Sequence, residues 1–189
     1  SGGWNPNVQL TCHLRNRPAW DDGLQAFVPA DLPSGMAVAG AAKGVFSTHG
    51  ALMTGAKAAV AALADLGLGA TEAPIPQAED APVGLSPLWY VPHKKGRAWV
   101  DQQNDVTVKD IKLAHQENFT SVEHLKRYTT LGMATDQGKT SNVTGLAVMA
   151  ELTGKTIPQT GTTIYRPPYT PVPIGAYAGR SAGMDFRPT

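Results

Sequence analysis

The sequence predicts a mixed α+β fold made of short strands and several helices. Near the N-terminus, a stretch of alternating polarity and a short apolar run precede an alanine-rich segment of helical composition. Three further segments with helix-capping residues follow between residues 98 and 154. Proline-rich stretches at 73–82 and 166–173 separate these regions, because proline interrupts both helices and central strands.

Two strands and one helix are expected in residues 1–66. Residues 8–14 alternate between apolar and polar side chains, which is the period of a half-buried strand. Residues 36–40 form a short apolar run that ends in small residues, as in a buried parallel strand. Ser47 is a suitable N-cap for a helix that continues to Leu66, where the following glycines are expected to end it.

The next segment, residues 67–97, is predicted to be a linker. Its prolines and its lack of periodicity exclude a regular element over residues 73–82. Residues 85–91 are mostly apolar and aromatic, which indicates that the linker lies along a surface of the protein.

Residues 98–154 are expected to form a compact helical unit. Residues 98–101 are strand-like, and residues 107–110 are typical of a capping box, with aspartate in place of the commoner glutamate. Ser121 is expected to cap a second helix. A third helix is predicted to begin after Ser141-Asn142 and to end at Gly154.

Composition limits the classes of function. The 189 residues carry a net charge of +1 and only 16% charged residues, which argues against nucleic acid or an anionic membrane as a partner and indicates a surface shared with other chains. The single cysteine, Cys12, excludes an internal disulfide and a multi-cysteine metal site, and it fits a cytoplasmic location. No apolar run is long enough to span a membrane. A start without methionine or signal peptide indicates a processed chain or an excised piece.

The chain shows no recognisable motif for catalysis or metal binding. No Gly-x-Ser-x-Gly elbow is present, and the histidines lack metal-ligand spacing. We therefore expect no catalytic residue and no metal ligand in this sequence. The histidines concerned are His13, His49, His93, His115 and His124.

Three motifs are long and ordered enough to indicate relatives. They are WVDQQNDVT at residues 99–107, SVEHLKRYTTLGMATDQGK at residues 121–139 and RPPYTPV at residues 166–172. With SGGWNP at the N-terminus and VAGAAKG at residues 38–44, they make nearly the whole chain resemble the alpha subunit of heterotetrameric sarcosine oxidase. That subunit is much longer, so the resemblance implies an internal fragment.

The resemblance implies a division into four regions. Residues 1–66 correspond to the end of a two-dinucleotide-binding, Rossmann-like domain, and residues 67–97 to a linker. Residues 98–160 resemble the small helical domain of bacterioferritin-associated ferredoxins. Residues 161–189 correspond to a second linker and the start of a folate-binding, aminomethyltransferase-like domain.

The ferredoxin-like domain is implied to lack its cluster. In the resembled domain, a Cys-x-Cys pair and a Cys-x4-Cys pair hold a two-iron two-sulfur cluster. Asp101, Gln103, Asp136 and Ser141 occupy the matching positions here, and none is cysteine. The expectation is therefore a retained scaffold without an iron–sulfur cluster.

The resemblance also implies cofactor contacts in two places. The turn formed by Gly40, Ala41, Ala42, Gly44 and Val45 is implied to border NAD, although small residues there equally serve tight packing.

A basic helix and the polar loop after it are implied to face flavin mononucleotide (FMN), which lies between the alpha and beta subunits in the family. The alternatives are a solvated helix face and a loop whose hydroxyls satisfy local backbone groups. This second group comprises Lys126, Arg127, Thr129, Thr130, Gln137, Lys139 and Ser141, with Thr135 and Asp136 in the same loop.

The implied function is a part in the oxidative demethylation of sarcosine to glycine. In the resembled complex, hydrogen peroxide is released and the one-carbon unit passes to tetrahydrofolate, which binds in a C-terminal domain outside this chain. The implied partners are the beta subunit and, with it, gamma and delta subunits, and the fragment alone is expected to be inactive. The alternative is a non-catalytic connector module of a related flavin-dependent amine oxidase or dehydrogenase.

Overall fold

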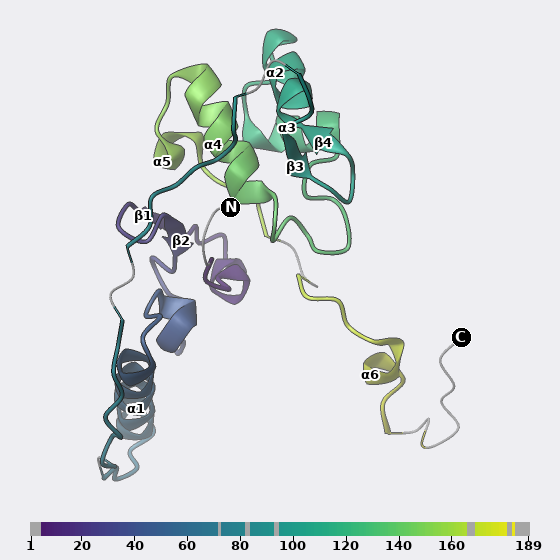
Figure 1. The fold of residues 1–189 in the computed structure, drawn as a ribbon. Helices are drawn as coiled ribbons and strands as arrows, with labels where there is room; N and C mark the ends of the chain where they lie inside the picture. The colour runs from purple at the N-terminus through teal and green to yellow at the C-terminus, as the bar shows by residue number, and fades with distance from the viewer. Residues whose placement is uncertain are drawn as a thin grey trace.

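The fold was determined as a computed structural model, which describes residues 5–71, 73–81, 84–92, 95–165, 169–180 and 183. Over these residues the predicted mixed α/β character is confirmed, with two small antiparallel hairpins among a larger number of helices (Figure 1). The long helix α1 (Thr48–Asp65) extends away from the unit that contains residues 98–160 (Figure 1). None of the helices within the described ranges is long and apolar enough to cross a membrane.

The predicted strand at residues 8–14 is wrong. The chain forms a 3-10 helix there, η1 (Gln9–Cys12), because side chains bond back to the preceding turn. The Thr11 hydroxyl donates to the Val8 carbonyl oxygen at 2.7 Å, and the Cys12 thiol donates to the same oxygen at 3.3 Å. In the described part of the chain no strand pairs with this segment, so its alternating pattern has no sheet to join.

A hairpin without a clear sequence signal follows. Strand β1 (Ala19–Asp21) pairs antiparallel with strand β2 (Ala26–Val28). Phe27 of β2 joins Val122 and Leu146 in a buried apolar cluster. The N-terminal hairpin is therefore attached to the helical unit far along the chain.

The predicted strand at residues 36–40 is also wrong. Residues 36–39 have no regular structure, and the chain then forms a 3-10 helix, η2 (Gly40–Lys43). The physical reason is the same as for residues 8–14: among the described residues, no neighbouring strand accepts its backbone hydrogen bonds.

Helix α1 begins and ends at the residues that the sequence predicts. The N–H of Gly50 donates to Ser47 Oγ at 3.2 Å, so the serine caps the helix. Gly67 takes the left-handed conformation with φ of 69°, and its N–H donates to the Ala64 carbonyl oxygen. None of the α1 residues is fully buried.

The segment after α1 contains no helix or strand over its described residues 67–71, 73–81 and 84–92. It runs back along α1 (Figure 1), where the His49 N–H donates to Asp80 Oδ1 at 3.2 Å. The His49 ring nitrogen Nδ1 also lies 3.1 Å from the Pro76 carbonyl oxygen. These contacts hold the linker along the helix.

The helical unit follows the predicted order. The first two helices begin at the predicted caps, since Thr107 and Asp110 form a capping box and Ser121 Oγ accepts the His124 N–H. The third begins at Asn142, one residue earlier than predicted, and ends at Gly154 as predicted. Its elements are β3 (Trp99–Asp101), β4 (Val106–Thr107), α2 (Val108–Gln116), α3 (Val122–Thr129) and α4 (Asn142–Thr153).

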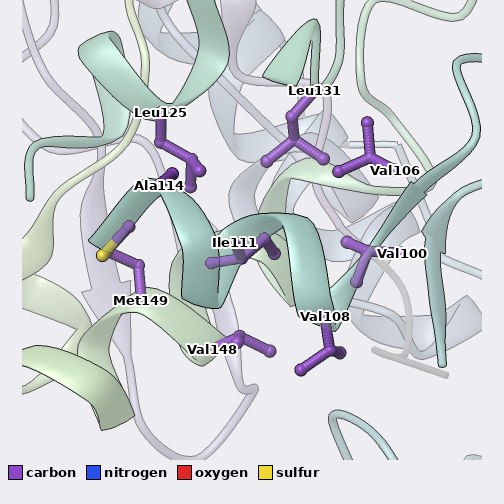
Figure 2. Close-up of a cluster of buried hydrophobic side chains, with 9 residues drawn as sticks. All are labelled: Val100, Val106, Val108, Ile111, Ala114, Leu125, Leu131, Val148 and Met149. Atoms are coloured by element: carbon purple, nitrogen blue, oxygen red, sulfur yellow. The ribbon is translucent and has the colours of Figure 1, made fainter. Parts of the chain in front are cut away.

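One apolar cluster holds these elements together. Ile111 and Ala114 of α2, Leu125 of α3 and Met149 of α4 are fully buried. Figure 2 shows these side chains gathered between the helices, with two valines of the β3–β4 hairpin beside them. Full burial of a large apolar side chain contributes about 1.5–3 kcal/mol, so this cluster is the main source of stability in the unit.

Two short helices were not expected from the sequence. Helix α5 (Ile157–Thr160) begins at a capping box formed by Thr156 and Gln159, a signal that the sequence does contain. Helix α6 (Ile174–Ala178) follows the proline-rich segment and has no buried residue. Residues 166–168 of that segment lie outside the described residues, and residues 171–173 are irregular, as predicted.

The loop from residue 130 to residue 141 is closed around Asn142. Gly132 and Gly138 both take left-handed conformations, with φ of 68° and 76°. A Cβ atom on either glycine would collide with the Asn142 side chain. Asn142 in turn donates through its backbone N–H to the Gly138 carbonyl oxygen at 2.9 Å, so the loop is packed onto the first turn of α4.

This packing predicts that Gly138→Ala is strongly destabilising. The matched control is Gly154→Ala, because Gly154 has a φ of 66° but nothing near its Cβ position. The control is expected to lose roughly 1–2 kcal/mol from backbone strain alone. Gly138→Ala is expected to lose a further ~1–3 kcal/mol from the collision, measured by denaturant unfolding. Equal losses in the two variants would contradict the packing of the loop on Asn142.

Candidate functional site

A cleft of about 280 Å³ opens between helix α3 and the loop of residues 130–141, here called the glycine loop after Gly132 and Gly138. It brings together three residues of the predicted flavin-facing group, Lys126, Arg127 and Gln137. Glu123, Gly132, Met133 and Ile164 complete its wall. The cleft therefore combines two cationic side chains, an amide, one carboxylate and an apolar edge.

Glu123 binds both Arg127 and the irregular segment of the chain that contains Ile164. Its Oε2 accepts from Arg127 Nη1 at 2.8 Å, and its Oε1 accepts the Ile164 N–H at 2.7 Å. Partial burial by itself raises the pKa of Glu123. The Ile164 N–H and the Arg127 guanidinium outweigh that effect and hold the pKa below its usual value. Glu123 is thus a carboxylate at neutral pH.

Asp101 supports the opposite wall of the cleft. Its carboxylate is 2% exposed and accepts the Gly132 N–H at 2.8 Å and the Ser141 hydroxyl at 3.4 Å. Its other oxygen accepts the N–H groups of Gln103 at 2.9 Å and Asn104 at 3.2 Å. One buried carboxylate therefore joins the β3–β4 hairpin, the glycine loop and the start of α4.

Four residues of the predicted flavin-facing group do not line the cleft. Thr129 donates its hydroxyl to the Leu125 carbonyl oxygen, and Thr130 ends α3 in the left-handed conformation. Lys139 donates to the Tyr169 carbonyl oxygen at 2.8 Å and lies 4.2 Å from the centre of the Tyr169 ring. Ser141 is buried against Asp101. Local structural roles thus account for these side chains.

Asp136 organises the tip of the loop. Its carboxylate accepts the N–H groups of Gly138 and Thr140 and the Thr140 hydroxyl. Burial by itself raises the pKa of Asp136. The Thr140 hydroxyl, the two N–H groups and the nearby Lys139 charge outweigh that effect, so the pKa lies below its usual value. Of the four positions that match cluster cysteines, only Asp101 and Ser141 bond to each other through their side chains.

The turn predicted to border NAD lies before α1, and none of its residues lines the cleft on α3. The Gly40 N–H donates to Thr54 Oγ1 at 3.0 Å, which fixes the turn to α1. A Cβ on Gly44 would come 2.7 Å from Leu24 Cδ1, so the glycine permits a close approach of the β1–β2 loop. Packing therefore explains the glycine at position 44.

The start of α1 is covered by Asp80 from the linker. Desolvation raises the pKa of Asp80, but the Ser47 hydroxyl, the His49 and Gly50 N–H groups and the His49 charge together hold it below its usual value. A carboxylate bound at a helix N-terminus occupies the position that favours phosphate groups. An anionic ligand at this helix end would therefore have to displace Asp80.

The described residues contain no group of three or more His, Cys, Asp or Glu side chains placed to hold a metal ion. His93 lies outside the described residues. Sequence reasoning missed Glu123 and Ile164 as parts of the cleft. The spacing of Glu123 and Arg127, one helical turn apart, is a signal that predicts their ion pair, whereas no sequence signal links Ile164 to α3.

The family model and the relatives that match this chain carry the same description, sarcosine oxidase. Residues 95–180 match the family described as the sarcosine oxidase A3 domain. The whole chain is similar to the sarcosine oxidase subunit alpha of Rhizobium meliloti (strain 1021), with 40% identity over 190 residues. It is also similar to the subunits of that description from Corynebacterium sp. strains P-1 and U-96, with 41% and 43% identity over 197 residues. The chain spans 19% to 20% of the length of these relatives.

A solved structure shares the fold. The crystal structure of L-proline dehydrogenase from P. horikoshii matches 92% of this chain and 37% of its own chain, with a TM-score of 0.63. The sequence identity over the match is 20%, so the likeness concerns the fold alone.

The Asp101 network predicts that Asp101→Asn is destabilising. The amide keeps one acceptor oxygen but presents an NH2 group to two of the donors, which leaves buried N–H groups without partners. We expect a loss of ~1–3 kcal/mol in the free energy of unfolding. Asp105→Asn, at an exposed turn of the same hairpin, is the control and is expected to change stability by less than about 0.5 kcal/mol. Similar stabilities of the two variants would contradict the role of Asp101.

The lowered pKa of Glu123 predicts a pH-dependent contribution to stability. Because the folded-state pKa lies below the unfolded value, the stabilisation is complete above the ordinary glutamate pKa and is lost as pH falls through the folded value. Glu123→Gln is expected to be about 1 kcal/mol less stable than the parent at pH 7, and the difference should close at acidic pH. Urea unfolding from pH 7 to pH 3 tests this, with the exposed Glu151→Gln as control. A difference that persists unchanged in acid would contradict it.

Proposed function

The chain belongs to the family of sarcosine oxidase alpha subunits, as a segment of such a subunit, and on this premise we propose that it helps to hold a flavin at a subunit contact. The proposed activity of the assembled enzyme is oxidation of sarcosine to glycine. The observation that carries the proposal is the cleft on α3, where Lys126, Arg127 and Gln137 converge.

The residues of the cleft fit a phosphate group. Two cationic side chains and one carboxylate leave its lining with a net positive charge. Only Nη1 of Arg127 is used in its bonds to Glu123, so among the described residues Nε and Nη2 remain for an anion. The ion pair with Glu123 also fixes the guanidinium in one orientation, which reduces the entropy cost of binding.

Lys126, Arg127 and Gln137 would hold the flavin, which would supply the redox chemistry of amine oxidation to the complex. The described side chains of the cleft supply binding and orientation, and we propose no general acid or base among them. The phosphate would lie against Lys126 and Arg127, while Met133 and Ile164 offer an apolar edge to the rest of the ligand. The proposed partner that completes the site is the beta subunit, with gamma and delta subunits in the same complex.

The contacts proposed for NAD and tetrahydrofolate have less support. The turn at residues 40–45 is engaged in packing, and Asp80 covers the adjacent helix start. NAD binding by this part of the chain would therefore require the linker to move. The family resemblance assigns tetrahydrofolate to a C-terminal domain whose start corresponds to part of residues 161–189.

A connector role is the second candidate, and one observation favours it. Glu123 and Lys139 both hold the segment after α5, through the Ile164 N–H and the Tyr169 carbonyl oxygen. Residues of the predicted flavin-facing group therefore also dock one region of the chain on another. The two roles are separable, because Lys139 lies outside the cleft and Arg127 lines it.

The test is the flavin content of the complex co-purified from the full-length subunit and its partner subunits. Arg127→Ala is expected to lower FMN affinity roughly tenfold or more, because it removes a charged donor and leaves Glu123 facing the phosphate. Arg127→Lys should recover part of the loss. Lys139→Ala is the matched control and should retain FMN, measured by absorbance of the released flavin.

Assembly and activity are measured on the same samples by size-exclusion chromatography and sarcosine-dependent release of hydrogen peroxide. Loss of flavin from an intact Arg127→Ala complex supports the site. Full flavin content in that variant rejects the site, and loss of assembly in the Lys139→Ala variant then favours the connector role.

A further inference from the structure

A second groove shares residue Ile164 with the cleft on α3. It has a volume of about 220 Å³ and is lined by the loop after η1 and by residues 162–165. The groove itself is formed without any residue of α3.

Two arginines provide the charge of this groove. Arg15 and Arg17 both line it, and no carboxylate does. Within the described part of the chain, the only salt bridge joins Arg127 to Glu123, and neither Arg15 nor Arg17 donates a hydrogen bond to a neighbouring residue. Asn16, between them, is already bonded to the Asp31 carbonyl oxygen at 2.7 Å. Over the residues that the structure describes, the two guanidinium groups therefore keep their donors for a ligand.

The rest of the groove is apolar or neutral. Pro18, Ile164 and the Tyr165 ring supply apolar surface beside the arginines. Burial raises the pKa of the Tyr165 phenol, although a hydrogen bond to Thr162 opposes that shift, so the phenol is uncharged at neutral pH. No lining group then compensates the two positive charges.

We infer that this groove binds a small organic anion, whose carboxylate or phosphate oxygens pair with Arg15 and Arg17 and whose apolar part rests on Pro18 and Tyr165. Guanidinium groups match the geometry of both kinds of anion. The volume lies below the ~300–1,000 Å³ of pockets for drug-sized molecules, which restricts the ligand to a small one. The inference does not depend on the proposed flavin contact, because the groove and the cleft share only Ile164.

Saturation-transfer NMR on the full-length subunit in its complex tests the inference. Benzoate is the probe, since it joins a carboxylate to a small apolar ring, and inorganic phosphate and acetate are the competitors. Benzoate is expected to bind the parent protein and to be displaced by both competitors. Arg15→Gln combined with Arg17→Gln should weaken benzoate binding roughly tenfold or more.

Arg97→Gln is the matched control, because Arg97 lies 5.5 Å from the Trp99 ring centre and outside this groove. It removes one positive charge and should leave benzoate binding unchanged. Unaltered binding in the double variant, or an equal loss in the control, overturns the inference. Binding to the separated subunit but not to the complex also overturns it, since the groove would then be filled by a partner chain.

Circular dichroism and flavin content complete the experiment. The double variant should melt within a few degrees of the parent protein, because both arginines are exposed. It should also keep its flavin, whereas the Arg127→Ala variant should lose flavin and still bind benzoate. The two proposals can therefore fail independently of each other.

Discussion

The buried carboxylate of Asp101 is the constraint on which the helical unit depends. A carboxylate that is 2% exposed is costly unless donors surround it, and here three backbone N–H groups and one hydroxyl do so. The donors come from the β3–β4 turn, from Gly132 and from Ser141. Because these segments are separated along the chain, the hydrogen bonds that they donate to Asp101 also fix their positions relative to one another.

The position of one wall of the cleft on α3 depends on Asp101. Gly132 is both a donor to Asp101 and a wall of the cleft, so the buried carboxylate positions the surface that faces solvent. Asn142 fills the space beneath Gly132 and Gly138. The apolar cluster around Ile111 and Met149 packs helices α2, α3 and α4 against one another.

Local signals predicted the parts of the fold that depend on nearby residues. The helices capped by Ser47, Thr107 and Ser121 begin at these residues, because a cap and its N–H partner lie within one turn. The strands predicted at 8–14 and 36–40 were wrong, since a strand needs a partner that its own sequence does not specify. The same limit applies to the site. Lys126, Arg127 and Gln137 were named from the family resemblance, and the structure places all three in one cleft, but the Glu123–Ile164 contact spans 41 positions and has no local signal.

The segment 162–165 contributes to both cationic regions of the molecule, which share only Ile164. Arg15 and Arg17 line one groove with this segment, and Lys126 and Arg127 line the cleft to which Ile164 also belongs. The Glu123 carboxylate holds the segment through the Ile164 N–H and at the same time pairs with Arg127. That carboxylate compensates charge on the α3 side only, which leaves the other groove with the larger uncompensated charge. Because Ile164 belongs to the wall of both, the Glu123–Ile164 hydrogen bond restrains one wall of each groove.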